Sequence, residues 1–166
     1  GDTPTIVEDD MPNSISGSFG SGDPDVGDSA DWTVISNGTY GNFVVDGNGD
    51  WIYTLNNSNN AVNRLDEGDL LQDTVQIKVV DRFGEVSIKN FVIDIEGNND
   101  GPSIQGDVAK TIREDTASFS GQLQDGDPDA HDTHLWSPSN LVGNYGSFTM
   151  TSSGAWVYSL NNALSE

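Results

Sequence analysis

Apolar and polar side chains alternate in two stretches of the first hundred residues. Residues 51–55 read WIYTL, in which Trp, Tyr and Leu alternate with Ile and Thr, and residues 75–79 read VQIKV. A period of two is typical of a strand with one buried face. A third stretch, VSIKNFVIDI at 86–95, changes its apolar parity after Ile88. This change predicts a β-bulge near Asn90.

Turn-forming residues separate these strands. DRFGE at 81–85 predicts a tight hairpin between the last two of them. In the segment before, NSNNAVNRLDEGDLLQ at 57–72, Ala61 lies four residues from Leu65, and Gly68 follows as a stop signal. This spacing predicts one short helical turn. The first hundred residues therefore predict about seven strands with one crossover.

The chain repeats itself at an offset of 104 to 106 residues. YGNFVVDGNGDWIYTLNN starts at residue 40, and YGSFTMTSSGAWVYSLNN starts at residue 145. TIVEDD at residue 5 likewise matches TIREDT at 111, and ISGSFGSGDPD at 15 matches FSGQLQDGDPD at 119. A repeat of about 100 residues has the size of an immunoglobulin-like sandwich.

The predicted fold is all-β: tandem immunoglobulin- or cadherin-like sandwich repeats. Residues 1–101 form a complete repeat, and 102–166 form the N-terminal part of a second, truncated or split one. The second copy lacks counterparts of the strands DTVQIKVVDRFGEVSIKNFVIDI at 73–95. Without them a neighbouring strand keeps a bare edge of N–H and C=O groups. We expect partial disorder there, or completion by another chain, as in a strand-exchanged dimer.

Composition excludes several classes of function. The chain has 6 basic and 27 acidic residues and a net charge of −21, which excludes nucleic acid as a partner. No apolar run is long enough for membrane insertion. With no cysteine, the fold uses neither disulfides nor thiolate metal sites. The charge alone is also compatible with simple solubility or a high-salt habitat, so the placement of the acids decides.

Several motifs resemble one family of repeats. They are ED after the first strand, DPD before the Trp-bearing region, YGNFVVDGNGDWIYTLNN, AVNRLDEGDLLQDTVQIKVVDRFG and the junction NNDGP. Together these resemble the VCBS-type, cadherin-like (bacterial immunoglobulin-like) repeat of large RTX-type bacterial adhesins exported by type I secretion. Two departures are visible: only GDTPT precedes the first IVED, which predicts a short first strand, and the second unit is incomplete.

The resemblance implies an extracellular rod of repeats on the bacterial cell surface, stiffened by calcium (Ca2+) and active in cell adhesion and biofilm formation. It implies neighbouring repeats of the same adhesin as partners. It also implies that a ligand-binding module can interrupt a repeat, and the position after Glu166, in a loop between strands, suits such an insertion. The ligand of such a module is unknown.

The acidic loops predict where calcium binds. In the sandwich topology, ED at 8–9, LDEGD at 65–69, NNDG at 98–101 and DGDPD at 125–129 meet at one joint, the arrangement that cadherins use. One such loop alone is usually only a turn, but four supply the six to eight oxygens that calcium needs. The expected ligands are Glu8, Asp9, Glu67, Asp69, Asn99, Asp100, Asp127 and Asp129 at the joint, Asp23 and Asp25 at the top of the first unit, and Glu114 and Asp115 in a lower half-site of the second.

Two other metal motifs are weaker. DGNGD at 46–50 has the look of an EF-hand start, but the second copy reads TSSGA and no helix follows, so we interpret it as a hairpin turn. His131 and His134 form an isolated H-x-x-H, for which we favour an exposed loop over zinc.

Three classes of function remain. An enzyme is disfavoured, because the acids lie in loops of a repeated scaffold and no catalytic residue is indicated. The favoured function is a calcium-rigidified extender that holds ligand-binding modules away from the cell. The alternative is a split scaffold domain that flanks or forms a carbohydrate- or protein-binding module. Trp32 and Trp136 could be exposed platforms in that case, although their paired positions favour the core.

Overall fold

The computed structural model describes residues 3–20 and 30–163. Asp23 and Asp25 lie outside the described residues. The chain divides into two compact units, Gly1–Asn99 (unit 1) and Asp100–Glu166 (unit 2). Within the described residues no helix is long and apolar enough to cross a membrane.

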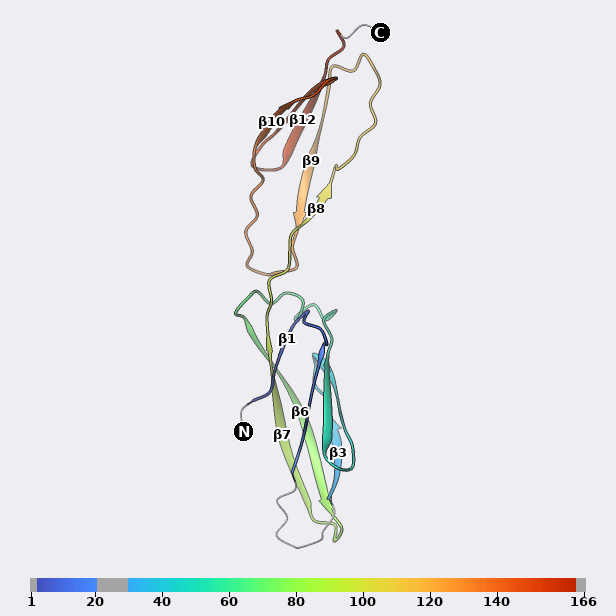
Figure 1. The fold of residues 1–166 in the computed structure, drawn as a ribbon, viewed down its shortest axis with the longest axis vertical. Coiled ribbons are helices and arrows are strands. Elements are labelled where there is room, and N and C mark those ends of the chain that lie inside the picture. Colours follow the sequence, from blue (N-terminus) through green and yellow to red (C-terminus); the bar gives the residue numbers. More distant parts are fainter. Residues whose placement is uncertain (1–2, 21–29, 164–166) are drawn as a thin grey trace. The chain divides into compact units, whose positions relative to one another are not determined.

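Unit 1 is a sandwich of two sheets (Figure 1). One sheet has the order β1-β7-β6-β3 and the other β2-β5-β4. β1 runs parallel to β7, and the other neighbours pair antiparallel. The strands are β1 (Thr5–Val7), β2 (Ser14–Ser18), β3 (Ala30–Ser36), β4 (Gly41–Val45), β5 (Asp50–Leu55), β6 (Leu70–Asp81) and β7 (Val86–Glu96). The predicted all-β sandwich is confirmed for unit 1.

The core of unit 1 lies between these two sheets. Burial in β5 alternates strictly, with Trp51, Tyr53 and Leu55 buried and the residues between them exposed, as the sequence predicts. Phe43 stacks on Trp51 with ring centroids 5.5 Å apart. The other buried apolar side chains of the core are Ile6, Val62, Val75, Ile77, Ile93 and Ile95.

One aspartate lies inside this core. Asp73 of β6 is 2 % exposed, and its carboxylate accepts hydrogen bonds from Thr39 N–H (2.7 Å), Tyr40 N–H (3.0 Å) and the Tyr53 hydroxyl (2.7 Å). Burial and this bond to Asp73 raise the pKa of Tyr53 well above its usual value. Because a buried carboxylate must be hydrogen-bonded, Asp73 fixes the loop 37–40 and β5 to the opposite sheet.

The hairpin between β6 and β7 is present where DRFGE predicts it, closed by Asp81 N–H to Glu85 C=O (3.1 Å). The prediction of a β-bulge near Asn90 is wrong. β6 and β7 pair without interruption from Leu70 opposite Glu96 to Val80 opposite Val86. The parity changes because Val86 and Ile88 face solvent, at 56 % and 53 % exposed.

The crossover at 57–69 consists of turns rather than a helix. One bond of helical spacing closes it, from Asn63 N–H to Asn59 C=O (2.9 Å). This is the single turn that the sequence indicates, and it does not continue. Val62 anchors the crossover, because its side chain is fully buried in the core.

The described residues of unit 2 form one five-stranded sheet of order β10-β11-β12-β9-β8 (Figure 1). Its strands are β8 (Ser103–Gly106), β9 (Ser118–Gly126), β10 (Ser139–Val142), β11 (Gly146–Met150) and β12 (Ala155–Leu160). β9, β12 and β11 correspond to β2, β5 and β4 of unit 1. Residues 111–113, which match β1, lie in no strand.

Candidate metal centre

The ED motif forms the same strained turn in both units. Asp9 has φ of 58° and the matching Asp115 has φ of 67°, in the left-handed region that few side chains other than Asn and Asp adopt. The turn places Glu8 directly after β1. Asp9, Glu114 and Asp115 are exposed.

Glu8 is the buried acid of this end of unit 1. Glu8 is 2 % exposed, and its Oε1 accepts a hydrogen bond from the Asn98 N–H at 3.1 Å. The Glu8 N–H donates to the Glu96 carbonyl at 3.0 Å. Both bonds hold the turn after β1 against the stretch 96–98, where β7 ends.

The acidic crossover approaches the same stretch. Asp69 accepts the Gly97 N–H with its backbone carbonyl at 3.0 Å, and its own N–H donates to the Asp66 carbonyl at 2.9 Å. Gly97 is buried, and a β-carbon there would collide with the Asp66 carbonyl. The absence of a side chain at Gly97 therefore lets the crossover pack on the end of β7, so Glu8 and Asp69 are tied to one segment. Glu67 is exposed.

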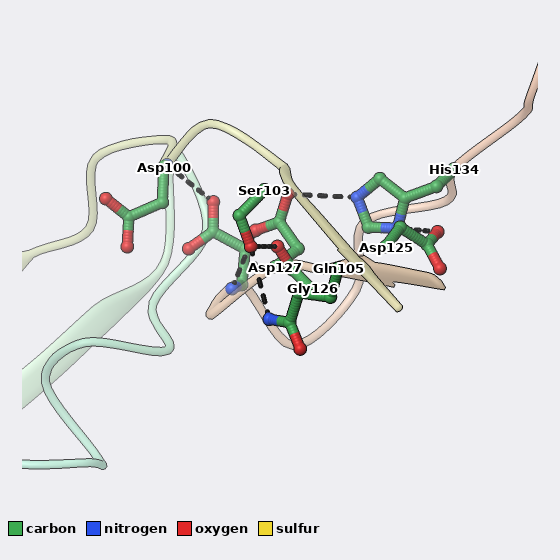
Figure 2. A network of polar contacts seen from close by, with 8 residues as sticks. Asp100, Ser103, Gln105, Asp125, Gly126, Asp127 and His134 are labelled. Carbon is green, nitrogen blue, oxygen red and sulfur yellow. Dashed lines mark hydrogen bonds and ion pairs between the residues drawn. The ribbon is translucent and has the colours of Figure 1, made fainter. Parts of the chain in front are cut away.

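In unit 2 a second acidic group gathers where β9 ends (Figure 2). Asp129 is 7 % exposed, and its Oδ2 accepts the Asp100 N–H at 2.8 Å. The Asp129 N–H donates to Asp127 Oδ1 at 3.1 Å. No described group donates a hydrogen bond to the buried Oδ1 of Asp129. Such an orphaned carboxylate oxygen is costly unless a cation or another donor reaches it.

His134 lies between two of these carboxylates (Figure 2). Its Nε2 is 2.9 Å from Asp127 Oδ2, and its Nδ1 is 3.0 Å from Asp125 Oδ2. Both contacts are hydrogen bonds only when both ring nitrogens carry protons, in the imidazolium form. The side chains of Asp127 and His134 are 2 % and 22 % exposed. The expected loop is present and His131 is exposed in it, but His134 is half-buried and packs against the acids.

Hydrogen bonds between β8 and β9 hold this loop in place. The Ser103 hydroxyl donates to the Gly126 carbonyl at 2.8 Å, and Gln105 Nε2 donates to the Ser103 hydroxyl at 3.3 Å. One ligating atom each from Asp127, Asp132 and His134 lies within 4.8 Å of the others. The sequence shows His134 only as part of an isolated H-x-x-H, for which we favour a loop over a metal site, and it gives no separate signal for Asp132.

The donor set of these two groups suits a hard cation. Carboxylate and carbonyl oxygens are the ligands that calcium prefers, and Asp129 offers an unused buried one. The DGNGD segment is the hairpin turn that the sequence predicts, because Asp46 Oδ1 accepts the N–H groups of Asn48 and Asp50.

Two solved structures resemble this architecture. Protocadherin gamma B2 extracellular cadherin domains 3–6 superpose with a TM-score of 0.54 at 10 % identity, covering 99 % of this chain and 38 % of that one. Domains 1–5 of the same protein give a TM-score of 0.54 at 12 % identity, covering 98 % and 32 %. The fold is cadherin-like. The chain spans about a third of the length of these proteins.

No family model matches the sequence. No curated protein matches it either. At 10 % to 12 % identity the cadherin likeness concerns the fold alone. What the protein does must be inferred from its own residues.

Proposed function

We propose that this chain is a calcium-rigidified extender repeat of a large bacterial cell-surface adhesin of the VCBS and RTX type, exported by type I secretion. It has no catalytic role, and it holds ligand-binding modules away from the cell in adhesion and biofilm formation. The observation that carries the proposal is the buried Asp129, whose Oδ1 accepts no hydrogen bond from any described group. The side chain of Asp127, which lies next to it, is also nearly buried. The cadherin-like fold supports it.

Calcium would be held by oxygens of the two acidic groups. Glu8, Glu67, Asp69 and Asn99 come from unit 1, and Asp100, Asp127 and Asp129 come from unit 2. Two like charges 4 Å apart repel by about 4 kcal/mol at the dielectric of a protein surface. A divalent cation removes that repulsion, and ligands drawn from both units would restrain their relative angle. Neighbouring repeats of the adhesin would be joined in the same way.

The test is calcium-dependent stability together with shape. A ligand that binds only the native state at a thousandfold excess over Kd stabilises it by about 4 kcal/mol. We therefore expect a higher Tm in millimolar calcium than in chelator, and a more extended, less variable shape by small-angle scattering. Asp129→Asn, which keeps an acceptor for the Asp100 N–H, should remove most of the increase in Tm.

The matched control is Glu85→Gln. It removes the same single charge from the exposed hairpin between β6 and β7, and it should leave the calcium response unchanged. An identical Tm in calcium and chelator would contradict calcium binding. A calcium-dependent Tm with an unchanged scattering curve would contradict rigidification only.

The alternative function is a split scaffold domain that flanks or forms a carbohydrate- or protein-binding module. One observation favours it: the described residues of unit 2 form a single sheet with a half-buried aromatic face. Binding on a glycan array by the chain itself would support this alternative, since an extender has no such ligand.

A further inference from the structure

Strand β7 directs a lysine toward the inside of the unit 1 sandwich. Its pairing with β6 places Lys89 opposite Ile77 and Ser87 opposite Val79. Residues directly opposite each other in antiparallel strands face the same side of the sheet, and Ile77 belongs to the core. Lys89 and Ser87 therefore lie on the side that faces the other sheet. A lysine on this side is unusual, because its ammonium group must stay solvated or find a partner.

Three aromatic rings lie on the same side of unit 1. The ring of Phe19 stacks on Trp32 with centroids 5.1 Å apart, and it meets the ring of Phe91 edge-on at 5.0 Å. All three side chains are half-buried, whereas Phe43 and Tyr53 in the same core are buried. Trp32 is thus neither an exposed platform nor a fully buried core residue. The stacked rings form a wall that is still open to solvent on one side.

A cleft of about 350 Å³ lies between the lysine and these rings. The three rings line it, and its polar lining residues are Ser87, Lys89 and Asn90. Sites for small ligands have volumes of about 300 to 1,000 Å³, so this cleft has room for a single ring-sized ligand. Apolar rings beside a few polar groups are the usual lining of such a site.

The charge in the cleft differs from that of the rest of the chain. Lys89 is one of 6 basic residues in a chain with 27 acidic ones. Among the described residues no carboxylate forms an ion pair with its ammonium group. The acidic group that contains Glu8 lies at the other end of β7, where the Glu8 N–H donates to the Glu96 carbonyl. The cleft therefore presents an unpaired cation next to apolar rings, and an anionic ligand depends on that cation because the net charge of −21 repels anions elsewhere.

We propose that this cleft binds an acidic sugar, a uronic acid unit of a polysaccharide. The apolar face of the sugar ring packs on the indole of Trp32, and the sugar carboxylate pairs with Lys89. The sugar hydroxyls form hydrogen bonds with Ser87 and Asn90. An aromatic acid would leave these two polar side chains unused, and a neutral sugar would leave the ammonium group unused. The proposal rests on the alternative function, carbohydrate binding, for which it names the ligand class and a site in unit 1. It involves neither acidic group.

The experiment is an NMR titration of the full chain with three probes: glucuronate, glucose and benzoate. The indole N–H of Trp32 and the amide of Lys89 report on the cleft. We expect saturable shifts of both signals with glucuronate, and binding that is at least about tenfold weaker for glucose, which lacks the carboxylate, and for benzoate, which lacks the hydroxyls. The absence of saturable shifts with glucuronate overturns the proposal. Equal binding of glucose or of benzoate overturns the assignment of an acidic sugar.

Two lysine variants separate the cleft from general electrostatic attraction. Lys89→Gln should weaken glucuronate binding at least about tenfold and leave glucose binding unchanged. Lys78→Gln is the matched control: it removes the same charge from β6, but Lys78 pairs with Ile88 and lies on the opposite face of the sheet. It should leave glucuronate binding unchanged, and equal weakening by both variants overturns the proposal.

The same variants distinguish this site from the two proposed functions. The increase in Tm caused by calcium should be the same in Lys89→Gln as in the unchanged chain, because the acidic groups lie elsewhere. A signal on the glycan array that persists in Lys89→Gln would support carbohydrate binding but overturn this site. Loss of that signal in Lys89→Gln, with its retention in Lys78→Gln, supports the cleft.

Discussion

Tyr53 and Tyr158 hold the same position in the two copies but have different surroundings. Tyr53 is fully buried, and its hydroxyl donates to Asp73 at 2.7 Å. Tyr158 lies on the corresponding strand of unit 2, β12, and packs against the corresponding glycine, Gly146, but it is only half-buried. The local sequence therefore determines that the tyrosine lies in a strand and contacts a glycine. How deeply the tyrosine is buried depends on the opposite sheet.

Other pairs of positions follow the same division. The ED turns have matching positive φ values at Asp9 and Asp115, because the turn is a local structure. Trp51 and Trp156 are both 7 % exposed, because each packs on a glycine of its own sheet. The matched aromatic residues differ: Phe43 and Tyr53, which contact Phe91 of β7 and Asp73 of β6, are buried, whereas Phe148 and Tyr158 are half-buried.

The largest expected difference follows from Asp73→Ala. The change leaves the buried Tyr53 hydroxyl and the part-buried N–H groups of Thr39 and Tyr40 without their acceptor, so it should destabilise unit 1 by roughly 3 to 5 kcal/mol. Unit 2 should keep its stability. Peptide-resolved hydrogen exchange in increasing denaturant measures each unit in the same sample.

The control for this change is Asp94→Ala. Asp94 accepts an exposed hydrogen bond from Gln72 Nε2 at 2.7 Å, so its loss should cost less than about 1 kcal/mol. Equal effects of the two variants would mean that the hydrogen bonds to Asp73 contribute no more to stability than a surface contact does.

A second comparison uses the matched phenylalanines. Phe43→Ala removes a ring that is 2 % exposed and should destabilise unit 1 by about 3 to 5 kcal/mol. Phe148→Ala removes a half-buried ring and should destabilise unit 2 by roughly 1 to 2 kcal/mol, in the ordinary range for single changes. The same exchange experiment measures both. A loss in unit 2 as large as that in unit 1 would show that its face is already covered.

The strands and turns could be predicted from the sequence because their signals are local. The alternation in residues 51–55 and the hairpin turn at DRFGE needed no knowledge of partners. The bulge near Asn90 failed for the opposite reason. Apolar Val86 and Ile88 face solvent at the end of the hairpin, and a pattern cannot distinguish an exposed apolar residue from a change of register.

The acidic loops could also be predicted from the sequence, but the contacts of individual acidic residues could not. Nothing in the sequence indicated that Asp73 would be buried among three donors, because an aspartate in a strand pattern reads as a solvent-facing residue. His134 was also unpredictable, since its two carboxylate contacts depend on how β9 and the following loop fold back. The roles of these residues come from long-range contacts.

The smallest expected effect tests whether the local structures really are equal. Gly49 and Gly154 close the matching hairpins with φ of 89° and 76°. A β-carbon on Gly49 would lie 2.8 Å from the Phe19 carbonyl, and one on Gly154 would lie 2.7 Å from the Leu123 carbonyl. Replacing either by alanine puts a side chain into the left-handed region and against a backbone oxygen, so each change should cost about 1 to 2 kcal/mol.

Because the turn and its contacts are the same, the two losses should agree within about 0.5 kcal/mol, the usual scatter of independent sites. Gly47→Ser is the control, since unit 2 already carries Ser152 at the matching position and the nearest atom to a β-carbon on Gly47 is 3.7 Å away. It should be nearly neutral. If Gly154→Ala destabilised unit 2 far less than Gly49→Ala destabilises unit 1, the hairpin would depend on the opposite sheet. The conclusion that the turns are determined by local sequence alone would then be wrong for this hairpin.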